Sequence, residues 1–224
     1  MTFATRMING TIRGVTRTIC RVDADELYKV PQRGPLILAV NHVNFLDAPL
    51  LYTHLLPRPI TALVKKETWD NLFLGALFSM WKAIPIRRGE VDLTAFKLAK
   101  EALAERQILV VAPEGTRSKT GYLQRGKPGF SLLASESRSP IQPMAFYGGE
   151  LIWDNMQHLV RTDFHVHVGG IYRLKSGIDI RDRQVRQGVT DEVMRLIAAL
   201  LPEKYRGEYG NIKMESLEYL EPAS

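Results

Sequence analysis

Residues 36–47 read LILAVNHVNFLD, an apolar run followed at once by a polar segment. The five consecutive apolar residues at 36–40 are typical of a strand that is buried on both faces of a sheet. After this strand, His42 comes in the turn, and Asp47 falls in the first turn of a helix that we expect to begin near Asn44. The stretch therefore predicts an α/β sheet with a polar site outside the carboxyl end of a strand.

Other segments repeat this alternation of strand and helix. Residues 92–106 place apolar side chains on one helical face and charged side chains on the other, and a strand pattern follows directly. Further apolar runs with the length of buried strands occupy residues 60–64, 108–112, 141–146 and 164–168. We expect an α/β fold with a mixed, largely parallel central sheet flanked by helices.

Two helical patterns and the last residues lie outside this alternation. Residues 69–81 are apolar nearly all round, which favours either a buried helix or a wall of an acyl-chain groove. Residues 190–201 begin with a good helix start and end before Pro202. Beyond them, residues 207–224 are expected to form a loosely packed tail.

The composition favours one folded domain over residues 1–224. Of the 224 residues, 45% are hydrophobic and 24% are charged, which is typical of a globular protein. The single cysteine, Cys20, cannot form an intrachain disulfide, and the first residues lack the apolar core of a signal peptide. A cytoplasmic location is the expectation that follows.

The charge and the first helix both favour anionic partners. The net charge is +6, which favours nucleic acid, phosphate-bearing substrates or an acidic membrane surface. Residues 1–21 predict an amphipathic helix with isoleucines on one face and Arg6, Arg13 and Arg17 roughly opposite. Such a helix can pack on its own domain or lie in a lipid headgroup layer. The basic loops lack interleaved aromatic residues, so we expect no nucleic-acid partner.

The pair His42 and Asp47 has two interpretations. A carboxylate that accepts from one imidazole nitrogen leaves the other nitrogen basic, as a general base requires. The same two residues can instead be a turn residue and an acidic residue that complements a helix start. The spacing alone favours the second interpretation.

Two basic loops strengthen the catalytic interpretation. After the strand at 108–112, residues 114–119 read EGTRSK, and glycine with arginine in a loop suits a phosphate. A shorter apolar run ends in Arg87 and Arg88.

His165 and His167 would share one strand face without a nearby set of ligands, so no metal site is predicted.

Four sequence blocks within residues 36–147 resemble, in the same order, those of the phospholipid/glycerol acyltransferase family, which includes the 1-acylglycerol-3-phosphate acyltransferases. NHVNFLD resembles the family's H-x4-D block, AIPIRRG its second block, PEGTRS its third and PIQPMA its fourth. The resemblance implies the glycerolipid acyltransferase fold. It also implies O-acyltransferase activity in phospholipid biosynthesis.

The resemblance assigns roles to individual residues. His42 would be the general base and Asp47 its partner. The phosphate of the acceptor would be bound by a second group of residues: Arg88, Glu114, Gly115, Thr116 and Arg117. The acyl side would be lined by Pro140, Ile141 and Pro143.

The expected reaction moves a fatty acyl group from acyl-CoA or acyl-carrier protein to lysophosphatidic acid and gives phosphatidic acid. No G-x-S-x-G motif is present, so direct attack without a covalent intermediate is expected, with no cofactor beyond the acyl donor. The amphiphilic substrates favour peripheral binding to the cytoplasmic face of an anionic membrane. The alternatives are another lysophospholipid acceptor, or a non-enzymatic protein that binds anionic lipid.

Overall fold

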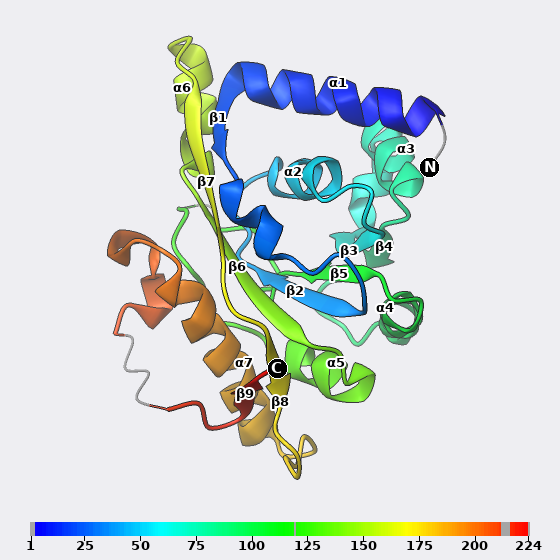
Figure 1. Cartoon of the computed structure of the whole chain (residues 1–224), viewed down its shortest axis with the longest axis vertical. Coiled ribbons are helices and arrows are strands. Elements are labelled where there is room, and N and C mark those ends of the chain that lie inside the picture. The colour runs from blue at the N-terminus through cyan, green and yellow to red at the C-terminus, as the bar shows by residue number, and fades with distance from the viewer. Residues whose placement is uncertain (1–2, 119, 212–215, 224) are drawn as a thin grey trace.

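The structure is a computed structural model that describes residues 3–118, 120–211 and 216–223 (Figure 1). Within these residues nine strands form one sheet, in which the order β1-β7-β6-β2-β5-β3-β4 is extended by β8 beside β6 and by β9 beside β8. The strands are β1 (Cys20–Asp23), β2 (Leu36–Val40), β3 (Ile60–Lys65), β4 (Ile84–Ile86), β5 (Ile108–Val111), β6 (Ile141–Tyr147), β7 (Thr162–Val168), β8 (Tyr172–Leu174) and β9 (Leu220–Pro222).

Helices cover both faces of the sheet (Figure 1). One face packs against α1 (Phe3–Ile19), α2 (Asp47–His54) and α3 (Leu72–Met80), and the other packs against α4 (Leu93–Ala104), α5 (Gly129–Ser137) and α7 (Arg183–Ala199). A short helix, α6 (Ile152–Gln157), lies between β6 and β7. Single 3-10 turns occupy Asp25–Lys29, Lys66–Asp70, Gly149–Leu151, Glu203–Tyr205 and Gly207–Tyr209.

The strand β2 is the centre of this arrangement. Its side chains alternate between the two cores, with Leu36, Leu38 and Val40 on the α2 side and Ile37 and Ala39 on the α4 side. All five are at most 4% exposed, as expected for a strand covered by helices on both faces. Since β2 runs parallel to β5 and β6, the carboxyl ends of the three strands meet at one edge of the sheet.

The predicted α/β architecture is confirmed. The apolar run at 36–40 is strand β2 with the same bounds, and the other predicted runs form β3, β5, β6 and β7 with ends shifted by one or two residues. The expected helix at 92–106 is α4, which begins after Asp92 because the Asp92 side chain accepts from the backbone N–H of Ala95. The amphipathic N-terminal helix is α1.

Two helix predictions need correction. The helix expected at 190–201 begins seven residues earlier, at Arg183, because the side chain of Asp182 accepts from the backbone N–H of Gln184 and caps it. The helix within 69–81 is buried only along part of its length. Leu72 and Phe73 are 86% and 88% exposed, because the first turn of α3 projects beyond the core.

The prediction of a loosely packed tail is wrong for residues 216–223. The side chain of Glu192 in α7 is 5% exposed, and its two oxygens accept from the backbone N–H groups of residues 218–220 at 2.5, 3.0 and 2.8 Å. Leu220 is fully buried, and β9 pairs with β8. A buried carboxylate needs such donors, so the end of the described chain is anchored to the domain. Residues 212–215 and 224 of the predicted tail lie outside the described part.

No helix in the described part of the chain is long and apolar enough to cross a membrane.

Candidate active site

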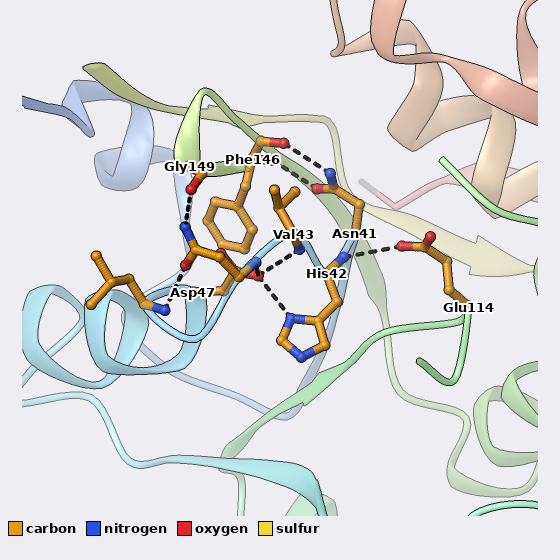
Figure 2. A network of polar contacts seen from close by, with 9 residues as sticks. Asn41, His42, Val43, Asp47, Glu114, Phe146 and Gly149 are labelled. Carbon is orange, nitrogen blue, oxygen red and sulfur yellow. Dashed lines mark hydrogen bonds and ion pairs between the residues drawn. The ribbon is translucent and has the colours of Figure 1, made fainter. Parts of the chain in front are cut away.

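His42 and Asp47 form a hydrogen-bonded pair just beyond the carboxyl end of β2 (Figure 2). The Nδ1 atom of His42 lies 2.8 Å from Oδ2 of Asp47. Because a carboxylate can only accept, this contact places the proton of a neutral imidazole on Nδ1 and leaves a lone pair on Nε2. Figure 2 shows Nε2 on the side of the ring that points away from Asp47. The pair therefore has the arrangement of a base and its orienting carboxylate.

Asp47 also shapes the loop that carries the histidine. Its Oδ2 atom accepts from the backbone N–H groups of Val43 and Asn44 at 2.8 and 3.1 Å. The side chain of Asp47 is 5% exposed, whereas that of His42 is 22% exposed. Asp47 begins α2, so it is at once a helix-start residue and the partner of the imidazole. The two interpretations of this pair are compatible.

Glu114 connects the His42 loop to the loop after β5. Its Oε1 atom accepts from the backbone N–H of His42 at 3.0 Å, and Oε2 accepts from that of Gln124 at 2.9 Å. The residue is 1% exposed. The geometry gives no support to the prediction that Glu114 binds the substrate phosphate, because both of its oxygens already accept from backbone N–H groups. Glu114 is a positioning residue.

Burial decides the protonation of Glu114. Loss of solvent raises the pKa of this carboxyl to about 7, and the negative charge of Asp47 acts in the same direction. The backbone N–H groups of Gln124 and His42 lower the pKa and offset part of this effect. A charge change near neutral pH therefore occurs directly behind the His42 backbone.

Two asparagines near His42 bind the end of β6 and the turn after it to the site. The side chain of Asn41 donates to the carbonyl of Phe146 at 2.8 Å and accepts from the N–H of the same residue at 2.7 Å. Asn44 donates to the carbonyl of Gly149 at 2.5 Å. A Cβ atom at position 149 would lie 2.4 Å from the amide nitrogen of Asn44, so this contact requires a glycine. Sequence reasoning missed this role of Asn41; the signal that could have found it is a polar residue directly after a buried strand.

The loop after β5 brings Arg117 close to the histidine. The backbone N–H of Ser118 donates to the carbonyl of His42 at 2.8 Å, so Arg117 and Thr116 lie beside the loop of the base. Gly115 adopts φ +68°, which glycine tolerates, and the side chain of Lys127 lies over it. A second cation, Lys127, therefore lies close to this loop, in addition to Arg117.

Arg88, which follows β4, lies near Arg117. Partial burial and the positive charge of Arg117 lower the pKa of Arg88, and the carboxylate of Glu67 offsets part of that effect. Two neighbouring guanidinium groups are well suited to share a doubly charged phosphate. The structure thus brings the second and third sequence blocks together.

Pro140 and Ile141 are not brought to His42. In the parallel pairing of β6 with β2, Ile141 is level with Ile37 at the opposite end of β2. Ile141 is fully buried, and the carbonyl of Pro140 accepts from the N–H of Ile37 at 2.8 Å. The geometry therefore gives no support to an acyl-side role for Pro140 and Ile141. Pro143 is level with Ala39 near the carboxyl end of β2, and its acyl-side role stays a prediction.

The two histidines considered for a metal site have other partners. His165 and His167 stack against the ring of Tyr147, with centroid separations of 4.6 and 5.6 Å. Each has one carboxylate within 3.6 Å, Asp23 and Glu26 respectively. Within the described residues no group of three or more His, Cys, Asp or Glu side chains could hold a metal ion.

Comparison with known proteins identifies a common family. The family model described as Acyltransferase matches residues 21–147. A 1-acyl-sn-glycerol-3-phosphate acyltransferase from Cocos nucifera is 35% identical over 121 residues, which are 52% of this chain and 39% of that protein. The enzyme of the same name from Bacillus subtilis (strain 168) is 27% identical over 120 residues, which are 53% of this chain and 59% of that protein. The matched region thus spans about half the length of these relatives.

The fold is also that of a solved structure. The crystal structure of the 1-acyl-sn-glycerophosphate (LPA) acyltransferase, PlsC, from Thermotoga maritima superposes with a TM-score of 0.63. The match covers 88% of this chain and 78% of that chain, at 17% sequence identity. This similarity concerns the fold alone. The His42 loop lies inside the residues that the family model matches.

The elevated pKa of Glu114 predicts an unusual dependence of stability on pH. The pKa is about 7 in the folded chain and has an ordinary value of 4.5, so the unfolded chain releases this proton first as the pH rises. The contribution of Glu114 to the free energy of unfolding should fall between pH 4.5 and pH 7, by on the order of 3 kcal/mol. Glu114→Gln should remove this loss.

Denaturant unfolding at pH 5 and pH 8 measures the difference. The free energy of unfolding of wild type and of Glu114→Gln should be similar at pH 5, and the variant should lose less at pH 8. The control is Glu203→Gln, which changes an exposed glutamate and should follow wild type. Parallel pH profiles for wild type and Glu114→Gln would contradict the prediction.

Proposed function

The chain belongs to the acyltransferase family, and we propose that it moves a fatty acyl group from acyl-CoA or acyl-carrier protein to the free hydroxyl of lysophosphatidic acid (1-acyl-sn-glycerol 3-phosphate). The product is phosphatidic acid. The observation that carries the proposal is the pairing of a half-buried base with a cationic surface at the same edge of the sheet. His42 provides the base, and Arg88 and Arg117 provide the cations.

The proposed reaction is a direct transfer. Nε2 of His42 takes the proton from the acceptor hydroxyl while that oxygen attacks the thioester carbonyl carbon. The carbon–sulfur bond of the tetrahedral intermediate then breaks, and the leaving thiolate takes the proton from Nε2 of the His42 imidazolium. Asp47 holds the imidazole through Nδ1 and stabilises the imidazolium that forms between these steps.

The acceptor is proposed from charge. Lysophosphatidic acid carries a phosphomonoester a few bonds from the hydroxyl that must react. Arg117 lies one residue from Ser118, whose N–H donates to the His42 carbonyl, so a phosphate on Arg117 would be close to the base. A phosphomonoester has more charge and more free oxygens for two guanidinium groups than a phosphodiester has, which favours this acceptor over other lysophospholipids.

We expect the protein to act at a membrane surface. Four strongly exposed apolar residues, called the apolar patch below, lie on α1 and α3: Phe3 (79% exposed), Met7 (58%), Leu72 (86%) and Phe73 (88%). Figure 1 shows the first turns of α1 beside α3, and Trp81 at the end of α3 donates to the side chain of Asn9 in α1 at 2.9 Å. An apolar patch on a basic protein supports peripheral binding to the cytoplasmic face of an anionic membrane.

His42→Ala tests the base. Removal of the imidazole should lower kcat for acyl transfer by about 10²- to 10⁴-fold, because that is the typical contribution of a general base. The assay is product formation from a panel of acyl donors and lysophospholipids, measured by mass spectrometry. His158→Ala is the matched control, since His158 is an exposed histidine in the segment after α6. Full activity in a folded His42→Ala protein would refute the mechanism.

Arg117→Ala tests the acceptor site. Loss of a charge-assisted contact to phosphate should raise KM for lysophosphatidic acid by roughly tenfold or more and change kcat less. The KM for the acyl donor should stay near that of wild type. Arg33→Ala removes an exposed arginine of a different loop and serves as the control. An unchanged KM for lysophosphatidic acid would place the phosphate elsewhere, and a better turnover of another lysophospholipid would change the acceptor.

Phe73→Ser tests the apolar patch. Burial of a phenylalanine contributes about 1.5–3 kcal/mol, so the change should weaken vesicle binding by roughly tenfold or more. Co-sedimentation with vesicles of phosphatidylcholine and phosphatidic acid measures the binding. Tyr28→Ser changes an aromatic residue that is 78% exposed on another part of the surface, and it should bind as wild type does. Equal losses in the two variants would contradict a specific role for the patch.

A further inference from the structure

A second basic pocket lies away from the candidate active site. It has a volume of about 550 Å³ and is lined by residues of α1, β1, β7, the loop before β7 and the last residue of α2, His54. Since α2 begins at Asp47 and ends at His54, the pocket is at the opposite end of this helix from the histidine base. The helix rise puts the two ends roughly 10 Å apart. None of the residues assigned to catalysis or to the acceptor phosphate lines it.

Arginine dominates the unneutralised charge of this pocket. Three of its lining residues are aspartates, and one of them, Asp163, pairs with Arg21 at 3.5 Å. The other two, Asp23 and Asp25, are outnumbered by the three remaining arginines of the lining: Arg13, Arg17 and Arg161.

The position of Arg161 is fixed by the backbone. Its guanidinium Nη2 donates to the carbonyls of Arg17 and Cys20 at 2.6 and 2.7 Å, which satisfies two carbonyls at the end of α1. Carbonyl partners hold the side chain in place without neutralising its charge. The positive charge at this end of α1 is therefore built into the fold.

Arg13 carries the clearest sign of an incomplete site. Its Nε atom is buried and has no hydrogen-bond acceptor within the described residues. Arg13 and Arg17 are one helical turn apart on α1, and no carboxylate pairs with either in the described part of the chain. A buried charged donor without an acceptor is costly, and the oxygens of an anion would supply the acceptors.

The pKa of His54 depends on the charge inside the pocket. Burial lowers its pKa, and the positive charges of Arg13 and Arg17 lower it further. Its Nδ1 atom donates to the carbonyl of Leu50 at 3.0 Å, which leaves Nε2 free. An anion between the two arginines would reverse their effect and raise the pKa of His54.

We propose that this pocket is a second phosphate-binding site, separate from the acceptor site, in which Arg13 and Arg17 bind the phosphate group and Arg161 completes the positive wall. The guanidinium forks match phosphate oxygens in shape and charge. A free phosphate and the phosphate of an anionic lipid headgroup present the same chemistry to these residues. The proposal does not depend on acyl transfer, so its test does not require turnover.

The test follows the imidazole signals of His54 by NMR in the full-length protein. Addition of inorganic phosphate should shift these signals in wild type and raise the pKa of His54. The double variant Arg13→Gln/Arg17→Gln should bind phosphate at least about tenfold more weakly, because it loses two charge-assisted contacts. Arg17→Gln alone, which changes an exposed side chain, guards against misfolding of the double variant.

Arg6→Gln is the matched control. It removes one charge from the same helix at an exposed position that does not line the pocket, and it should respond to phosphate as wild type does. A phosphate response of the double variant equal to that of wild type would overturn the proposal. So would an equal loss in Arg6→Gln, because the effect would then reflect general charge.

A second arm identifies the source of the phosphate. The same His54 signals are followed in phosphatidylcholine bicelles with and without phosphatidic acid. A shift with phosphatidic acid that the double variant lacks assigns the pocket to a lipid headgroup, whereas a shift with inorganic phosphate alone assigns it to a soluble phosphate. No shift of the His54 signals with either ligand would overturn the proposal.

Discussion

The strand β2 lies between β5 and β6 and runs parallel to both, and this pairing determines where every polar group of the site can lie. Parallel strands end at the same edge, so three loops that are far apart in sequence leave the sheet side by side. Buried polar side chains then join the loops. Glu114 bridges the first two, and Asn41 and Asn44 bind the first to the third. The base is held by this framework, because a buried donor or acceptor left without a partner would cost free energy.

The sequence predicts the strands whose side chains are uniformly buried. It does not predict the strands that are only partly buried. The run at 36–40 reads as a strand because all five side chains are inside, and His42 with Asp47 could be placed at its end. The short strands β1, β8 and β9 have mixed burial and no pattern that separates them from loops. The exposure of Leu72 and Phe73 depends on how far α3 extends past the sheet, which no local pattern encodes.

For the site, too, the sequence predicts some residue roles and not others. The resemblance of four blocks predicts that Arg88 and Arg117 lie together and bind the same phosphate. The effect of Arg117 on the pKa of Arg88 agrees with their proximity. Glu114 could not be separated from the arginines by sequence, because a motif does not reveal which side chains turn inward. Pro140 and Ile141 belong to the fourth block but lie at the amino end of β6, so a block can match for structural reasons alone.

The three donors on Oδ2 of Asp47 have a consequence for the reaction coordinate. The imidazole and two backbone N–H groups are fixed on this one atom in the folded chain without any substrate. The orientational entropy of the base is therefore lost once, during folding, and the dipoles around it need little reorganisation when the proton moves. In the proposed mechanism, such preorganisation would let the short, eight-residue helix α2 hold the base ready for proton transfer from a flexible amphiphilic substrate.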